Sequence, residues 1–215
     1  MPEVTEKMHA GEAVLSESNG SRSRDGITVL QDQVLKAGHV LGKVSIGAAT
    51  PAAKAGGNTG NGTLATVTVS GAAKAGVYKL RMIEPATNLG TFMLEDPEGI
   101  LVGTGVVGTE FVGGGLTFTV ADGATDFVAG DGFDITVAAG SGKYKEYNPG
   151  NTDGSQKSEG VLYEAVDATG ADKKGVAIMR DAEVIAEHLQ WFSGADANQK
   201  AAGQADLALA GIIAR

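Results

Sequence analysis

Short runs of β-branched and aromatic residues, separated by Gly, Asp, Asn and Pro, fill the middle of the chain. Each run spans only a few residues, and this stretch lacks the apolar repeat of about 3.6 residues that marks an amphipathic helix. Short strands with turn residues between them are typical of an all-β sandwich or barrel. The predicted strands cover residues 63–69, 76–83, 91–94, 116–120 and 133–137.

Residues 58–138, which contain these runs, are predicted to form an inserted, Ig-like β-sandwich domain. The segments on either side carry more charge and fewer glycines. Residues 47–57 are expected to be an Ala/Gly linker into the insert, and the Gly-rich residues 139–142 form the second joint. One domain can be inserted into another where its two ends lie close together at a surface.

The flanking residues 27–57 and 139–215 are predicted to form one small β-rich domain. Both parts contain short apolar runs that are bounded by Gly, Asp or Asn, which is a strand pattern. The strands are expected at residues 27–30, 40–46 and 160–166. The chain is therefore predicted to be mainly β.

Residues 174–185 contain two apolar runs, which predict two strands that meet at Arg180-Asp181. Residues 182–192 fit a helix about as well, because their apolar positions fall near one helical face. This pattern alone does not choose between the two structures.

Residues 196–210 are predicted to form the one clear helix of the chain, near its C-terminus. Ala, Gln, Lys and Leu dominate the segment. Asp196 can cap its N-terminus, and Gly211 is a typical terminating residue. A short apolar strand is expected to follow at residues 212–214.

Residues 1–26 are polar and lack periodicity. Such a segment buries too little apolar surface to offset the entropy lost on ordering. It is expected to be an extended, mobile arm.

The composition excludes several kinds of site. With 42% hydrophobic and 20% charged residues among 215, the chain is globular rather than disordered. Its formal net charge of −9 argues against direct binding to nucleic acid through a general positive field. Because the chain has no cysteine, disulfide bonds and thiolate zinc sites are excluded.

The chain has no run of about 18 apolar residues, so neither a transmembrane helix nor a membrane partner is expected. Residues 1–7 lack the apolar region of a signal peptide. We therefore expect synthesis in a cytoplasm, followed by retention there or release without a signal.

Gly103, Gly105 and Gly108 match the GxGxxG pattern of dinucleotide-binding sites. That site needs a helix after the motif, and the Gly-rich residues 109–115 do not form a stable one. Gly142-Lys143 resembles the end of a phosphate-binding loop, but Tyr144 stands where Ser or Thr must bind magnesium. We interpret these glycines as turn residues and expect no cofactor.

Four aspartates, Asp122, Asp126, Asp131 and Asp134, lie in a Gly-rich stretch and could supply oxygen ligands to calcium. Their spacing does not fit an EF-hand loop, and Asp is a common neighbour of Gly in turns. We therefore prefer the interpretation as turns and predict no metal site.

The three histidines, His9, His39 and His188, are scattered along the chain, and no serine lies in a nucleophile-elbow pattern. No catalytic residues are predicted, so the chain is not expected to be an enzyme. Trp191 is the only tryptophan, and its sequence context fits a core position or a subunit interface.

Read without residues 58–138, the flanks resemble the head decoration proteins of lambda-type phages. The resemblance covers roughly residues 12–50 and 141–215 and rests on the order and spacing of several weak motifs. These motifs are residues 12–24 followed by Ile27-Thr28-Val29, residues 35–44, Lys143-Tyr144, and residues 151–155, 160–167, 175–180 and 209–212.

This resemblance implies a structural capsid protein without enzymatic activity. Members of the family sit as homotrimers at three-fold and quasi-three-fold points on the outer surface of the expanded head. There they clamp neighbouring major capsid subunits against the pressure of packaged DNA, and their N-terminal arm becomes ordered on binding. The expected location is therefore the outer capsid surface of the virion, after synthesis in the host cytoplasm.

Candidate residues follow from combining the resemblance with the local sequence. Arg22 and Arg24 concentrate positive charge in an acidic chain and suit forked hydrogen bonds to capsid carboxylates. The candidates for capsid binding are Ser16, Asn19, Arg22, Arg24, Ile27 and Val29. The candidates for the trimer interface are Val176, Ile178, Trp191 and Phe192.

Two alternatives come from other functional classes. The chain could be a tail, fibre or surface adhesion module whose inserted domain binds carbohydrate, or a secreted enzyme or binding protein. A shallow aromatic platform would favour carbohydrate binding, yet the aromatic residues of the insert fall mostly at core-like strand positions. They are Tyr78, Phe92, Phe111, Phe118, Phe127 and Phe133.

Overall fold

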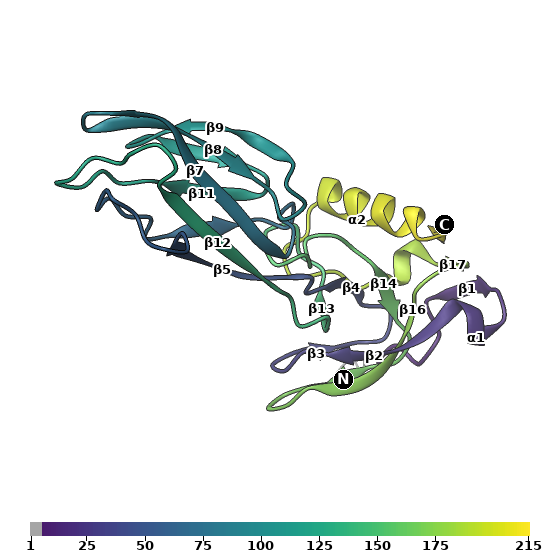
Figure 1. Ribbon diagram of the computed structural model, residues 1–215. Coiled ribbons are helices and arrows are strands. Elements are labelled where there is room, and N and C mark those ends of the chain that lie inside the picture. Colours follow the sequence, from purple (N-terminus) through teal and green to yellow (C-terminus); the bar gives the residue numbers. More distant parts are fainter. Residues whose placement is uncertain (1–5) are drawn as a thin grey trace. The chain divides into compact units, whose positions relative to one another are not determined.

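The computed structural model describes residues 6–215, which form two compact units (Figure 1). The first unit consists of the residues up to Val44 together with Gly142–Arg215, and the second consists of Ser45–Ser141. The prediction of a mainly β chain with one C-terminal helix is confirmed. In the described part of the chain, none of the helices is long and apolar enough to cross a membrane.

A closed five-stranded barrel forms the centre of the first unit. Its strands, in order around the barrel, are β13 (Tyr144–Glu146), β2 (Arg24–Val29), β16 (Lys173–Ile178), β14 (Gly160–Leu162) and β4 (Val40–Lys43). Alternation along β2 turns Ile27 and Val29 into the barrel, where they form one buried cluster with Leu41, Leu162 and Ala177. Closure leaves no unpaired strand edge in this sheet.

A second layer of the first unit covers the outer face of the barrel. It contains a small sheet with the order β1 (Val14–Glu17), β17 (Ala182–Val184) and β18 (Ile212–Ala214), together with helix α2 (Ala197–Leu209). Two short strands, β3 (Val34–Leu35) and β15 (Val166–Asp167), pair beside the barrel. Buried residues from both layers, among them Val161, Ile178 and Leu207, form one core cluster.

Helix α2 begins and ends where its sequence predicts. The side chain of Asp196 accepts a hydrogen bond from the backbone N–H of Gln199, and the Gln199 side chain accepts one from the Asp196 N–H, which completes a capping box. Gly211 follows the helix with a φ of 79°, a left-handed conformation that glycine adopts at low cost. The chain then continues into β18, as expected.

Several features of the first unit differ from the sequence-based expectations. Residues 182–192 are not a helix, because β17 is followed only by the 3₁₀ turn Ala186–His188. The described part of the expected mobile arm is folded into the body: β1 pairs with β17, a helical turn α1 (Gly20–Ser23) follows, and β2 enters the barrel. The rest of that arm, residues 1–5, lies outside the described residues.

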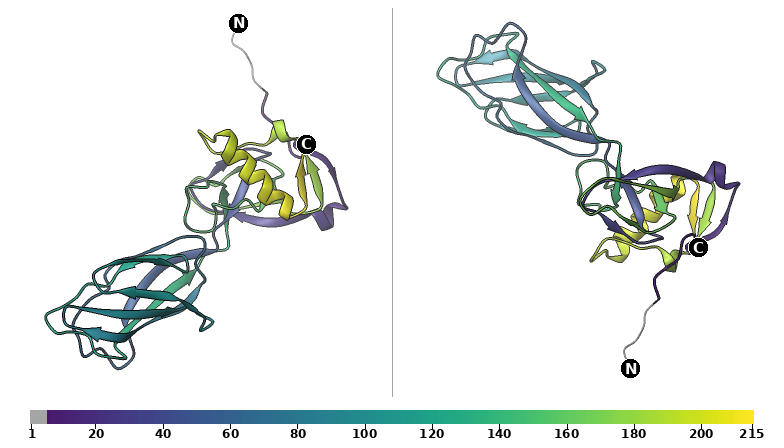
Figure 2. Two further views of the ribbon diagram at one scale, coloured as in Figure 1. Left: turned by 90° about the horizontal axis from the view of Figure 1, so that it is seen from above. Right: turned by 90° about the horizontal axis from the view of Figure 1, so that it is seen from below.

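The second unit is a two-sheet β structure around one core (Figure 2). Its larger sheet has the order β5 (Ile46–Ala53), β12 (Gly132–Ala139), β7 (Gly76–Ala86), β8 (Leu89–Glu95) and β9 (Leu101–Val106). Its smaller sheet has the order β10 (Glu110–Gly113), β11 (Leu116–Thr119) and β6 (Val67–Val69). The buried aromatic residues of both sheets face inward, as their strand positions indicate.

The sequence pattern did not predict three strands of the second unit. Residues 47–57 were expected to be a linker, but β5 occupies most of them and pairs with β12, with Pro51 opposite Ile135. Strands β9 and β10 lie in the Gly-rich segment that was assigned to turns. Small residues such as Ala and Gly carry no strand pattern, because the pairing of their backbone is decided by the neighbouring strand.

Backbone hydrogen bonds join the two connections between the units. The N–H of Val44 donates to the carbonyl of Lys143, and the N–H of Gly142 donates back to the carbonyl of Val44, each at 2.9 Å. Inside the second unit, the N–H of Gly140 donates to Ser45 at 3.0 Å. The point where the chain leaves the first unit is therefore adjacent to the point where it returns.

We predict that replacing residues 46–140 by a short Gly/Ser linker leaves the first unit folded, because Val44 and Lys143 are already hydrogen-bonded neighbours. Cooperative urea unfolding, followed by the fluorescence of Trp191, measures this. The matched deletion of residues 58–138 retains β5 without its partner β12, and should give a less soluble protein. Loss of the cooperative transition in the 46–140 deletion would contradict independent folding.

Candidate functional site

Charged residues hold the segment 14–25 against the turn between β16 and β17. Arg22 Nε lies 2.7 Å from Asp181 Oδ2, and Arg180 pairs with Asp25. Arg24 pairs with Glu17, and its guanidinium lies 3.9 Å from the ring centre of Tyr163. We call this set the arm anchor: Glu17, Arg22, Arg24, Asp25, Arg180 and Asp181.

Backbone groups complete the arm anchor. The N–H of Ser18 donates to the carbonyl of Asp181 at 3.0 Å, and the N–H of Met179 donates to the carbonyl of Ser23 at 2.8 Å. Asp181 adopts a φ of 51°, which Asp tolerates better than most residues. The polar segment is thus ordered by partners, not by burial of apolar surface. Because Arg22 and Asp181 are 159 residues apart, sequence reasoning missed this arrangement.

Electrostatics stabilise the arm anchor at neutral pH. The hydrogen bond from Arg24, and to a lesser degree that from Ser23, holds the pKa of Glu17 below its usual range, although burial acts to raise it. The same pairing with Glu17 raises the pKa of Arg24. Both groups are therefore charged wherever the chain is folded near neutral pH.

The six predicted capsid-binding residues divide into two groups. Ser16, Asn19 and Arg22 are exposed, and Arg24 is half-buried. Ser16 Oγ donates to Glu183 at 2.9 Å, and the Asn19 side chain accepts from Ser21 N–H as the cap of α1.

Ile27 and Val29, in contrast, lie in the core of the barrel. Their assignment to a binding surface is wrong for this conformation, because strand alternation turns both side chains inward. The β-prone pattern of residues 27–29 reflects strand pairing inside the barrel.

The four predicted subunit-contact residues also separate. Ile178 is fully buried within its own chain, so its side chain cannot contact another subunit in this conformation. Val176 lies two positions earlier on β16 and is half-buried. Trp191 and Phe192 are half-buried as well, and both pack edge-on against Tyr147, with ring centres 5.9 and 6.3 Å apart.

Trp191 also holds helix α2 in place. A Cβ at Gly203 would lie only 2.5 Å from the Trp191 ring, so the helix approaches the indole through this glycine. Tyr147 donates its hydroxyl to the carbonyl of Gln199 at 3.2 Å. Burial, together with the nearby charge of Asp206, raises the pKa of Tyr147. Trp191 is therefore a partly buried residue that packs against the core of the first unit.

Each of the three histidines contacts an oxygen atom of the same unit. His39 is buried, with Nε2 2.7 Å from Glu146 Oε1. His188 Nδ1 donates to the carbonyl of Glu12 at 3.0 Å, and His9 lies within 4 Å of Glu6 and Glu12. Between residues 6 and 215, no group of three or more acidic or histidine side chains is arranged to hold a metal ion.

The GxGxxG segment has a packing role. Gly103 and Gly105 lie on β9 opposite Leu94 and Phe92, and a Cβ at Gly105 would come within 2.4 Å of the Phe92 ring. Gly108 has a φ of 81° in the turn that leads to strand β10. A strand follows the motif. The interpretation of these glycines as turn residues therefore holds for Gly108 and is wrong for Gly103 and Gly105, which lie on a strand.

Two of the four aspartates, Asp126 and Asp131, accept hydrogen bonds from backbone N–H groups of loops. Asp131 accepts hydrogen bonds from the N–H groups of Thr59, Gly60 and Val128. Burial acts to raise its pKa, but these N–H groups hold it below the usual range. Asp126 accepts from Asn88 N–H and Asp134 pairs with Arg81. One oxygen of Asp122 is buried without a hydrogen-bond partner.

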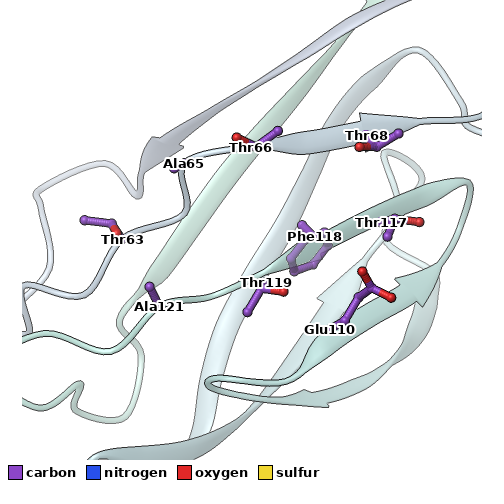
Figure 3. A pocket seen from close by; sticks show the side chains of 9 residues that line it. All are labelled: Thr63, Ala65, Thr66, Thr68, Glu110, Thr117, Phe118, Thr119 and Ala121. Atoms are coloured by element: carbon purple, nitrogen blue, oxygen red, sulfur yellow. The ribbon is translucent and has the colours of Figure 1, made fainter.

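The surface formed by residues 6–215 includes two hollows that could receive a ligand. One, of about 540 Å³, lies beside residues 6–12 of the first unit and is lined mainly by charged side chains and Met8. The other, of about 350 Å³, lies on the outer face of the small sheet of the second unit (Figure 3). Its lining is dominated by threonines, which the sequence analysis did not single out. The lining residues are Thr63, Ala65, Thr66, Thr68, Glu110, Thr117, Phe118, Thr119 and Ala121.

Comparison with known proteins identifies one family. The model of the family described as bacteriophage lambda head decoration protein D matches residues 3–212. Curated proteins give no match. Two crystal structures of Xanthomonas campestris FlgL align with 51% of this chain at 21% identity and a TM-score of 0.34. The alignments span about a third of FlgL, 34% and 33%, and carry no conclusion about fold or function.

We predict that Glu17→Gln lowers the free energy of unfolding by about 1–2 kcal/mol at pH 7, because the Arg24 and Ser23 donors lose a charged acceptor. Since the pKa of Glu17 is lowered in the folded state, its contribution is complete above the unfolded value and is lost as the pH falls below about 4. Urea unfolding of both proteins at pH 7 and pH 3 checks the sign.

The control for this experiment is Glu187→Gln, which removes an exposed carboxylate outside the arm anchor. It should leave stability unchanged at either pH. An equal loss of stability in Glu17→Gln at pH 3 and pH 7 would show that packing, and not the charge pair, is responsible.

Proposed function

We propose that this chain, which belongs to the bacteriophage lambda head decoration protein D family, binds the outer surface of the expanded phage head as a trimer. The chain is a phage head decoration protein, and its first unit is the part proposed to contact the capsid. Seated at three-fold sites, the trimer would clamp neighbouring major capsid subunits against the pressure of packaged DNA. The single observation that carries the proposal is the family match across residues 3–212.

The exposed part of the arm anchor supports a capsid contact. The Arg22 side chain is 73% exposed, although it is paired with Asp181. An exposed ion pair contributes little to stability, so exchanging Asp181 for a capsid carboxylate costs little. Ser16 and Asn19 lie on the same exposed segment. Arg22 is therefore the residue we assign to the capsid contact.

Strand β1 offers a second way to bind a partner. It pairs with β17 on one side only and is an edge of its sheet. An unpaired edge can add a strand from another protein through backbone hydrogen bonds. Leu15, which is 54% exposed on this strand, gives such a contact an apolar side chain.

The subunit contact is assigned to Val176, Trp191 and Phe192. Each is half-buried in the isolated chain, so each still has apolar surface to bury. Tryptophan in particular is enriched at the centres of protein interfaces. We propose that these side chains meet around the three-fold axis of the trimer.

The second unit is proposed to be an inserted domain that leaves the capsid contact to the first unit. This supports decoration over the alternative of a tail or fibre module, because the family match runs through both flanks of residues 45–141. The family is structural, so no reaction is proposed.

Mixing the purified chain with expanded and unexpanded empty heads, followed by sedimentation, tests the capsid contact. We expect binding to the expanded heads only. Arg22→Glu should weaken it about tenfold and flatten its salt dependence, because a charge pair with the capsid is replaced by repulsion. Lys200→Glu, the same change of charge on exposed α2, is the control. Wild-type affinity in Arg22→Glu would remove Arg22 from the contact.

A density map of the decorated heads tests whether the bound chain is assembled as a trimer. We expect density in groups of three around three-fold positions, with occupancy lowered by Phe192→Asp, because a carboxylate is costly in an apolar contact. The control is Val34→Asp at a side chain that is 67% exposed elsewhere on the same unit. Isolated monomers, or dimers on two-fold axes, would exclude the proposed assembly.

A further inference from the structure

The outer face of the small sheet of the second unit carries a regular array of hydroxyl groups. Thr66 and Thr68 extend from the segment of β6, and Thr117 and Thr119 from β11 (Figure 3). The strand register places Thr68 opposite Thr117 and Glu110 opposite Thr119. The threonines of two strands and Glu110 of a third strand therefore lie within one hollow of about 350 Å³.

The groups in this hollow lack partners inside the protein. Among residues 6–215, no hydrogen bond involves the hydroxyls of Thr66, Thr68, Thr117 or Thr119, and Glu110 forms no ion pair. Each hydroxyl can both donate and accept, whereas the carboxylate accepts only. The face thus presents donors and acceptors at fixed positions to an external ligand.

The array is also preorganised. Threonine is β-branched, so its χ1 angle is restricted on a strand and little rotamer freedom is lost on binding. Sheet geometry places neighbouring threonines about 4.8 Å apart between strands and about 6.7 Å apart along a strand, so several of them can contact one saccharide chain at once. The methyl groups of threonine, with Ala65 and Ala121, supply apolar contacts for the C–H faces of a sugar.

The opposite face of the same unit has a different chemical character. The outer side of the large sheet carries Lys79 and the ion pair of Arg81 with Asp134, with 2.6 Å between the charged atoms. Long charged side chains of this kind cover a strand surface. The lining of the hollow contains no lysine or arginine and only one acid, Glu110, so the threonine face stays open.

We infer that this threonine face binds a neutral glycan. Glu110 would accept hydrogen bonds from two hydroxyls of one sugar, and the threonine pair of β6 and β11 would bond to the next. The net negative charge of the unit disfavours anionic glycans, because it has nine acidic residues against four basic ones between Ser45 and Ser141. A shallow face gives weak single-site binding, which many copies on one particle strengthen; only this last step depends on the proposed decoration function.

The test uses the full chain, displayed as a streptavidin tetramer, on an array of immobilised glucans, mannans, galactans and N-acetylhexosamine polymers, with sulfated and sialylated glycans beside them. We expect binding to at least one neutral class. The isosteric double variant Thr68→Val with Thr117→Val should weaken it at least about tenfold, and Glu110→Gln should weaken it measurably.

Thr136→Val is the matched control, since Thr136 is an exposed strand residue on the outer side of the large sheet. It should bind like the wild type, and all variants should keep the wild-type unfolding transition. Absence of binding to every neutral glycan, unchanged binding by the double variant, or an equal loss in Thr136→Val would each overturn the inference. The glycan-binding experiment contains no capsid, so its outcome is independent of the sedimentation experiment.

Discussion

The barrel of the first unit closes only because segments on either side of residues 45–141 pair with each other. Strand β4 lies before the second unit and β13 after it, and their register places Leu41 opposite Glu146 and Lys43 opposite Tyr144. Closing a long flexible loop carries an entropic cost that grows with loop length. In the second unit, its first strand β5 and its last strand β12 pair directly. The folded second unit therefore brings its own ends together and acts as a short connection.

This closure determines which parts of the chain can face a partner. Once β2 is paired on both sides, with β13 and with β16, its apolar side chains fill the barrel and its polar neighbours stay outside. The segment before it is then held by the arm anchor, in which the pair of Glu17 and Arg24 is less exposed than the pair of Arg22 and Asp181 and lies beside the ring of Tyr163. Arg22 and Ser16 remain at the surface. The same arrangement thus separates residues that maintain the fold from residues that are free to bind.

The second unit also separates side chains that maintain the fold, on the inner faces of its sheets, from side chains that can bind a partner, on an outer face. Glycines on β9 give room to the rings of Phe92 and Phe111, which lie 5.8 Å apart in the core. The apolar side chains of β6 and β11 also point into that core, so alternation turns the threonines of these strands outward. Because apolar packing is satisfied on the inner face, the outer face can carry side chains chosen for another purpose. This is the physical basis for assigning a ligand to that face.

The sequence by itself determined the features that depend on local chemistry. It predicted the mainly β class, and it predicted helix α2 from Asp196 at one end to Gly211 at the other, since a cap and a terminator act on adjacent backbone groups. Only the tertiary structure decided what depends on distant partners. The arm anchor forms because Asp181 lies beside Arg22, and the Ala/Gly-rich strand β5 forms because β12 pairs with it. Ile27 and Ile178 are buried because the barrel closes. Local sequence cannot specify these contacts, since another segment of the chain supplies each of them.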